Sequence, residues 1–127
     1  MFKRIDHVEI VPLDVERTYR FYTEVLGFGL KQRLPVPMPP LREVIYLQLG
    51  DTMLELVSLE APQKGEAHPQ RSGYQALALE VLDMNAAVAH LKHHGVPIHR
   101  QPVDLGDSWR GEILDPDGLV IELRQWK

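Results

Sequence analysis

The chain begins with a change from a strand pattern to a helix pattern. Apolar and polar residues alternate over residues 7–10, whereas apolar residues recur every three to four positions between 15 and 26. Asp14 stands just before the second segment, where a carboxylate can accept hydrogen bonds from first-turn amides. Gly27 follows it, where many helices end in a left-handed residue. The pattern predicts a strand and then a helix.

The same succession recurs in the second half of the chain. Residues 76–81 alternate, and residues 84–91 return to helical spacing. Asp83 and Gly95 mark the two ends of this second helical segment. Such internal similarity indicates that one structural unit occurs twice.

Each predicted helix is followed by segments that favour strands. Four short segments are rich in β-branched and aromatic residues and partly alternate: 42–50, 52–59, 109–114 and 119–125. The turns "GD" and "DPDG" lie beside them. The segments 49–60 and 116–127 also match each other, with Glu55 on Glu122. The sequence therefore predicts an α+β fold made of two β-α-β-β-β units.

Two segments interrupt this plan. "LPVPMPPLRE", residues 34–43, contains four prolines and is expected to be a loop over one face. "EAPQKGEAHPQRSG", residues 60–73, has few apolar residues and is expected to connect the halves. We therefore predict one domain over 1–127. It divides into module one at 1–62, a linker at 63–72 and module two at 73–127.

Composition narrows the class of protein. The 127 residues are 44% hydrophobic and 25% charged, which is typical of one globular domain, and the net charge is −4 without a basic stripe. We therefore expect neither nucleic acid nor a membrane as a partner. The chain has no cysteine, its N-terminal residues are too polar for a signal-peptide core, and no apolar run approaches the ~20 residues of a membrane helix. We expect a cytoplasmic protein.

Three residues suggest a metal site. Glu55 and Glu122 each interrupt an apolar strand pattern, and an unpaired carboxylate in apolar surroundings is costly. Together with His7 they offer one imidazole and two carboxylates, a set that suits a divalent ion. The alternative is structural: His7 as a core histidine, and the glutamates paired with Arg110 or Arg124. From the residues alone, both interpretations stay open.

Five motifs carry a family resemblance: "IDHVEI", "FYTEVLGF", "LGDTMLEL", "ALEVLDMNAAVAHLKHHGV" and "DPDGLVIEL". Their order and spacing resemble those of the glyoxalase, bleomycin-resistance and ring-cleaving dioxygenase superfamily, also called the vicinal oxygen chelate family. The resemblance covers nearly the whole chain. It implies two βαβββ modules that form a mixed, open, β-barrel-like sheet around a cavity, with the helices outside and a divalent metal within.

The resemblance also implies which positions bind the metal. His7, Glu55 and Glu122 match three family ligands, whereas Ala76 stands where metal-binding members commonly carry a histidine. Gln75 is adjacent but is expected to point to the opposite face. Two other histidines are able to approach from a loop or a neighbouring strand: His68 and His99. The missing histidine argues against the two-histidine iron site of a ring-cleaving dioxygenase.

The resemblance favours a metal-dependent lyase or isomerase, similar to lactoylglutathione lyase or methylmalonyl-CoA epimerase. Such an enzyme acts on a small oxo or acyl-thioester substrate, with Zn, Ni, Mn, Co or Fe polarising a carbonyl while a carboxylate moves a proton. The candidate proton carriers are Glu55, Glu122 and Glu9, which shares the face of His7.

A metal-free binding protein of the bleomycin-resistance type is the alternative. Tyr46, Met53 and Trp109 are candidates to line its cavity, and Arg110 is a candidate partner for an anionic group on a small molecule. Each of these residues is explained equally well as an ordinary core or surface residue. Because an open sheet edge needs a partner, we also expect a homodimer.

Overall fold

The computed structural model describes residues 1–66 and 70–127, so His68 lies outside the described residues. The chain divides into two compact units, Met1–Gly65 and Glu66–Lys127. This division falls within the polar segment 60–73. No helix among the described residues is both long enough and apolar enough to cross a membrane.

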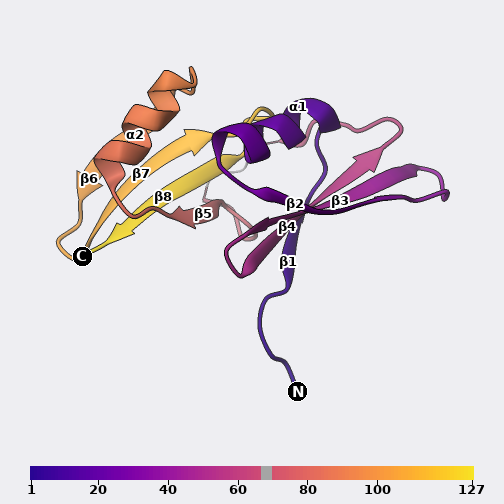
Figure 1. The fold of residues 1–127 in the computed structure, drawn as a ribbon, viewed down its shortest axis with the longest axis horizontal. Coiled ribbons are helices and arrows are strands. Elements are labelled where there is room, and N and C mark those ends of the chain that lie inside the picture. The colour runs from indigo at the N-terminus through magenta and orange to yellow at the C-terminus, as the bar shows by residue number, and fades with distance from the viewer. Residues whose placement is uncertain (67–69) are drawn as a thin grey trace. The chain divides into compact units, whose positions relative to one another are not determined.

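The first unit contains one four-stranded sheet and one helical segment (Figure 1). Its elements are β1 (His7–Ile10), α1 (Val15–Arg20), η1 (Phe21–Val25), β2 (Gly29–Pro35), β3 (Leu41–Leu49) and β4 (Thr52–Leu59). The strand order is β1-β4-β3-β2, in which β1 runs parallel to β4 and the other pairs are antiparallel. The central strand β4 therefore lies between the first strand of the unit and the hairpin.

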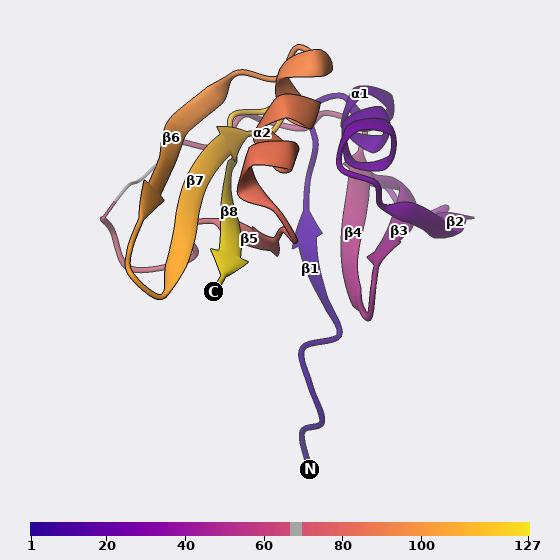
Figure 2. The same cartoon turned by 60° about the vertical axis from the view of Figure 1, so that its left-hand side comes forward.

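The second unit repeats this topology (Figure 2). Its elements are β5 (Leu77–Glu80), α2 (Met84–His93), β6 (Ile98–Asp104), β7 (Ser108–Leu114) and β8 (Val120–Trp126). The strand order is β5-β8-β7-β6, again with one parallel pair. The predicted α+β fold with a duplicated β-α-β-β-β unit is confirmed. Within the described part of the chain, the strand pairs form two separate sheets, and closure around a cavity stays a prediction.

The predicted helix ends are confirmed. The carboxylate of Asp14 accepts from the amide of Arg17 at 3.1 Å, and that of Asp83 accepts from the amide of Ala86 at 2.8 Å. Gly27 and Gly95 have φ angles of 82° and 72°, in the left-handed region that favours glycine. The two aspartates and the two glycines therefore define where each helical segment starts and stops.

The first helical segment differs from the prediction in one respect. After α1 it widens into the π-helical turn η1, in which the amide of Leu26 bonds the carbonyl of Phe21 at 3.2 Å. Apolar spacing alone does not distinguish this turn from an α-helix, because both bury one face.

The proline-rich segment 34–43 is a loop only in its middle, which corrects the prediction. Leu34 and Pro35 end β2, Leu41 begins β3, and Pro35 pairs with Glu43 across the hairpin. Pro35 is tolerated because β2 is the edge strand of its sheet, where one side of the backbone needs no amide donor.

Strand alternation separates a core face from an opposite face in the sheet of the first unit. Ile45, Leu47, Leu54 and Leu56 are at most 1% exposed and form the core with Tyr22. Residues between them, including Tyr46 and Glu55, point to the opposite face. Glu55 is nevertheless buried, so its carboxyl group is largely shielded from solvent.

Candidate metal centre

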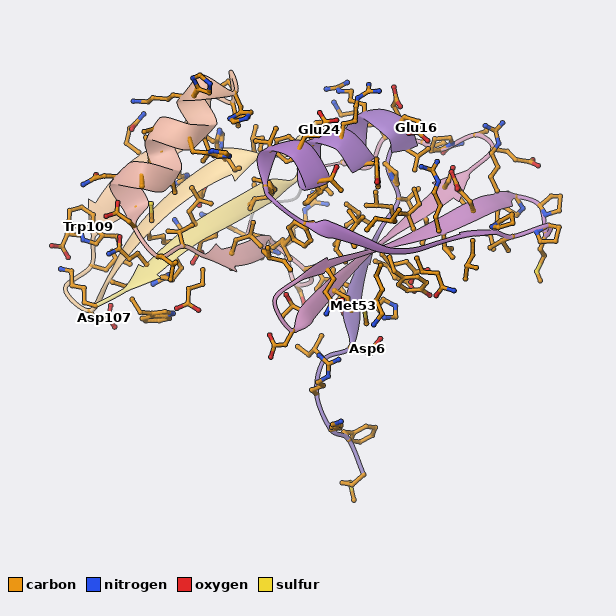
Figure 3. The ribbon with its side chains drawn as sticks, in the orientation of Figure 1. Asp6, Glu16, Glu24, Met53, Asp107 and Trp109 are labelled. Atoms are coloured by element: carbon orange, nitrogen blue, oxygen red, sulfur yellow. The ribbon has the colours of Figure 1, made fainter. Side chains whose placement is uncertain are left out.

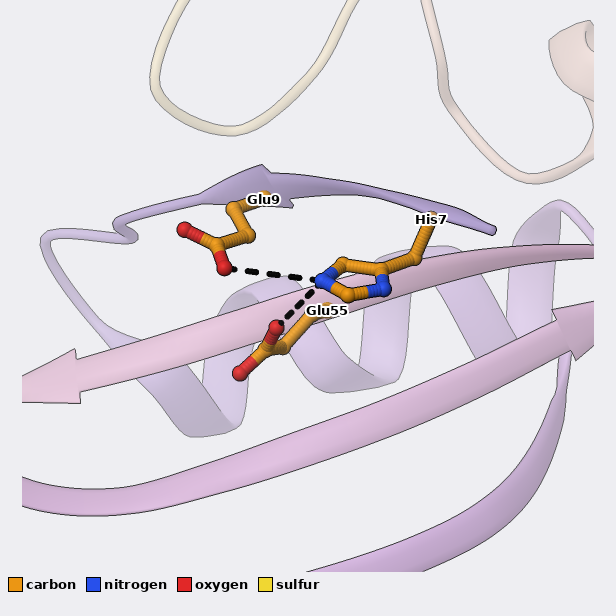
Figure 4. Close-up of side chains that lie close together, drawn as sticks. All are labelled: His7, Glu9 and Glu55. Carbon is orange, nitrogen blue, oxygen red and sulfur yellow. Dashed lines mark hydrogen bonds and ion pairs between the residues drawn. The ribbon is translucent and has the colours of Figure 1, made fainter. Parts of the chain in front are cut away.

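The parallel pair β1 and β4 brings three side chains of metal-binding types together. In the register of this pair, Glu9 lies beside Glu55 and His7 beside Met53. His7, Glu9 and Glu55 therefore project from neighbouring strands toward one another (Figure 4). One ligand atom from each lies within 4.8 Å of the others, and no other such group of three or more occurs among the described residues.

The imidazole of His7 is the centre of the cluster. Its Nε2 lies 2.9 Å from Oε2 of Glu55 and 3.5 Å from Oε1 of Glu9, and its Nδ1 lies 2.8 Å from Oδ2 of Asp6. The Glu55 side chain is 7% exposed and that of Glu9 is 63% exposed. The cluster therefore runs from a buried carboxylate, through the histidine, to a carboxylate at the solvent.

Burial and like charge shift the acid–base properties of these groups. Burial raises the pKa of Glu55, and the carboxylate of Glu9 raises it further, against the lowering effect of His7. The hydrogen bond with Asp6 raises the pKa of His7, and the contacts with Glu9 and Glu55 add to this against its partial burial. Without a metal, Glu55 and His7 therefore each hold a proton more readily than the isolated side chain would.

The donor set suits a divalent transition-metal ion. One imidazole nitrogen and two carboxylate oxygens match the ligands of Zn, Ni, Mn, Co and Fe, and the cluster faces solvent on the side of Glu9. Asp6 occupies the place of an outer partner, since it binds the other ring nitrogen of His7. The residues present therefore fit a metal.

Asp6 is a further candidate for the site, and the sequence patterns do not single it out. It directly precedes β1, at the same end of the sheet as Met53 at the start of β4 (Figure 3). The signal in the sequence is its position directly before His7, a predicted metal ligand. The pattern of strand faces does not reveal it, because Asp6 lies outside the strand.

Tyr46 and Met53, the cavity candidates of the first unit, share the face of the cluster. Tyr46 lies beside Glu55 in the β3–β4 register, and its ring stands edge-on to the His7 ring at 5.7 Å. Burial raises the pKa of Tyr46, and the charge of Glu55 raises it further. The Tyr46 hydroxyl therefore stays protonated beside Glu55.

Glu122 has a different set of partners in the second unit. Arg110 donates from Nε to Oε2 of Glu122 at 2.9 Å, and Arg124 donates from Nε and Nη2 to Oε1 at 3.0 and 2.7 Å. Burial raises the pKa of Glu122, but these two arginines outweigh it, so the pKa is lowered overall. The arginine pairing considered in the structural alternative is thus present for Glu122, whereas its role as a metal ligand stays a prediction.

The register of β5 and β8 shows how the two units differ at this position. Ala78 lies beside Glu122, as Glu9 lies beside Glu55, and Ala76 is two residues earlier, as His7 is. The second unit therefore has alanine at both places where the first has a candidate ligand. Gln75 donates from its amide nitrogen to the carbonyls of Arg71 and Gly73 in its own loop.

Trp109 and Arg110, the other two cavity candidates, are neighbours on β7 and point to opposite faces of its sheet. Arg110 lies on the face of Glu122 and also donates to Glu112 at 2.6 Å. Trp109 lies near the start of β7 (Figure 3), and the ammonium group of Lys127 lies 5.5 Å from the centre of its ring.

Comparison with known proteins identifies the family. Residues 4–123 match the Glyoxalase/Bleomycin resistance protein/Dioxygenase superfamily, and the chain belongs to it, which confirms the resemblance seen in the motifs. The chain is 32% identical over 122 residues to the uncharacterized protein YaeR of Escherichia coli (strain K12), with 95% of each chain covered. It is 28% identical over 130 residues to mitochondrial methylmalonyl-CoA epimerase of Homo sapiens, which covers 96% of this chain and 73% of the epimerase. The crystal structure of TnmS3, an antibiotic binding protein from Streptomyces sp. CB03234, matches with a TM-score of 0.79 and 25% identity, covering 99% of this chain and 98% of TnmS3.

Proposed function

We propose that this protein is a metal-dependent isomerase or lyase of the glyoxalase type that acts on a small oxo or acyl-thioester substrate. The observation that carries the proposal is the convergence of His7, Glu9 and Glu55 on one strand pair. Membership of the superfamily and the likeness to methylmalonyl-CoA epimerase support it. Because one fold hosts many reactions, the argument depends on what these residues can do.

His7 and Glu55 are the principal metal-binding residues in this proposal, because their facing atoms are close and Glu55 is buried. Glu9 supplies the third donor of the first unit. Glu122 is the further ligand implied by the family pattern, and it has to leave Arg110 and Arg124 before it can bind an ion. A divalent ion held here supplies Lewis acidity that polarises a substrate carbonyl.

Glu9 is the carboxylate best placed to move a proton at the carbon beside such a carbonyl. Its side chain is 63% exposed, so it reaches substrate more easily than the buried Glu55. Glu55 is the second candidate, because its raised pKa favours uptake of a proton nearer to neutral pH. Asp6 keeps the His7 ring oriented in either case.

The experiment is proton exchange in deuterated water. The metal-loaded protein is incubated with a panel of oxo compounds and acyl thioesters, including methylmalonyl-CoA, and mass spectrometry follows deuterium uptake beside the carbonyl. We expect uptake with wild-type protein, its loss in Glu9→Gln at metal concentrations that still load this variant through His7 and Glu55, and loss of both metal and uptake in Glu55→Gln. Glu24→Gln, on the exposed side of η1, is the matched control and keeps both.

Two results of the exchange experiment would contradict parts of this proposal. Absence of uptake with every compound, in protein shown to hold metal, would contradict the enzymatic proposal. Retention of uptake in Glu9→Gln would instead assign proton transfer to another carboxylate, and Glu122→Gln then distinguishes Glu122 from Glu55.

A metal-free binding protein is the second candidate, and the likeness to the antibiotic binding protein TnmS3 favours it. In this case Tyr46 and Met53 contact an apolar or aromatic ligand on the first unit, and Arg110 contacts an anionic group. Thermal stabilisation by such ligands in the presence of a chelator supports this function. Stabilisation only after metal is added supports the enzyme.

A further inference from the structure

A second group of histidines lies at the C-terminal end of α2, in the other unit of the chain. His90, His93 and His94 are all exposed, and none belongs to the His7 cluster. The ring centres of His90 and His94 are 4.3 Å apart, and those of His93 and His94 are 5.4 Å apart. His90 and His94 are four residues apart, the spacing that places two side chains on one side of a helix.

The hydrogen bonding of His94 prepares its ring for a metal. Its Nδ1 lies 2.9 Å from the backbone carbonyl of His90. A carbonyl can only accept, so Nδ1 carries a proton and donates it, and the nitrogen that the ring offers to a metal is Nε2. This is the tautomer and the outer hydrogen bond that metal-binding histidines generally show.

The end of the helix fixes the backbone that carries His94. The amide of His94 bonds the carbonyls of His90 and Leu91, and the amide of Val96 bonds the carbonyl of Leu91 at 2.9 Å. Leu91 and Val96 are buried, and Gly95 takes the left-handed conformation that permits this cap. The backbone that carries His94 is therefore fixed before any ion arrives.

The position also favours positive charge. The last carbonyls of a helix form the negative end of its dipole, which stabilises cations within the last turn. α2 extends over ten residues, and its last turn contains His90 and His93. A divalent ion bound by the rings adds charge where the helix backbone stabilises it.

We infer that His90 and His94 form a second metal site, specific for imidazole-preferring ions such as Cu²⁺, Ni²⁺ and Zn²⁺ and independent of the His7 cluster. Two imidazole nitrogens select these ions over Mg²⁺ or Ca²⁺, which prefer oxygen ligands. Cu²⁺ binds tightest, in accordance with the general order of affinities for nitrogen ligands.

The test is a Zn²⁺ titration of the full chain, monitored by NMR through the ¹⁵N signals of the histidine rings. These signals report each site separately. We expect the His90 and His94 Nε2 signals to shift together with one dissociation constant. Replacement of one of two linked ligands removes the chelate advantage, so His94→Gln should weaken binding at His90 roughly 100-fold. His99→Gln, an exposed histidine at the start of β6, is the matched control and leaves that constant unchanged.

Three results would overturn the inference: no shift of the His90 and His94 signals at saturating Zn²⁺, unchanged binding at His90 in His94→Gln, or equal weakening in His99→Gln. Gly95→Ala provides a second readout, because a side chain at φ 72° strains the helix cap. We expect it to weaken Zn²⁺ binding at His90 while the His7 signals respond as in wild type.

Discussion

Glu55 and Glu122 hold equivalent positions in the two units but have opposite electrostatic surroundings. Glu55 faces His7 and Glu9, and its pKa is raised, whereas Glu122 faces two arginines, and its pKa is lowered. Internal repetition in the sequence was sufficient to equate the two glutamates. It was not sufficient to assign their partners, because Arg110 comes from β7, and strand neighbours are set only when the sheet forms.

Asp6→Asn tests whether orientation of His7 matters for the proposed metal site. An amide at this position keeps the size of the side chain but removes the charge that binds Nδ1 of His7. Loss of such an outer partner typically weakens metal binding roughly 10- to 100-fold, and we expect that range here. Isothermal titration with Zn²⁺ measures it. Asp51→Asn, in the turn before β4, is the control, and an equal loss in both variants would contradict the role of Asp6.

The helices and strands were largely predictable because each has a local signal. Asp14 and Asp83 predict where the two helical segments begin, and the alternation of apolar and polar residues predicts β4 and β8. The π turn η1 and the entry of Pro35 into β2 had no such local signal. The entry of Pro35 depends on the edge position of β2, which is set only when the sheet forms.

Asp83→Ala measures the contribution of one helix cap. Removal of the carboxylate leaves the amide of Ala86 without its acceptor. We expect the free energy of unfolding to fall by about 1 kcal/mol. Urea denaturation followed by circular dichroism gives this value. Asn85→Ala, at an exposed position in the first turn of α2, is the control and should not destabilise the protein, because alanine is a strong helix former.

Acid should weaken the second unit through Glu122. Because Arg110 and Arg124 lower the pKa of Glu122 in the folded protein, this residue stabilises the fold at pH values above its unfolded pKa of about 4.5. The contribution is lost as the pH falls through the lower, folded value. Urea midpoints between neutral pH and pH 3 should therefore fall less steeply in Glu122→Gln than in wild type. Parallel curves for the two proteins would contradict this pairing.

The whole chain has two similar units, each with its own sheet and core, and the sequence predicted this duplication. Its motifs predicted the superfamily correctly as well. Sequence patterns do not determine the arrangement of the two sheets, because strand alternation and helix caps are local signals. The predicted cavity and the pairing of site residues from both units depend on that arrangement.

A homodimer is expected because β1 and β2 are edge strands of the first sheet, and β5 and β6 are edge strands of the second. Light scattering coupled to size-exclusion chromatography should give twice the chain mass of 14.6 kDa. A mass equal to one chain at every concentration tested would contradict the expectation.

The proposed metal centre is tested most directly by crystals soaked in Zn²⁺ or Co²⁺ and measured at the absorption edge of the metal. We predict an anomalous peak bounded by Nε2 of His7 and the carboxylates of Glu9 and Glu55, and the same map reveals whether Glu122 also reaches the ion. Soaked crystals with no anomalous peak beside His7 would contradict the account.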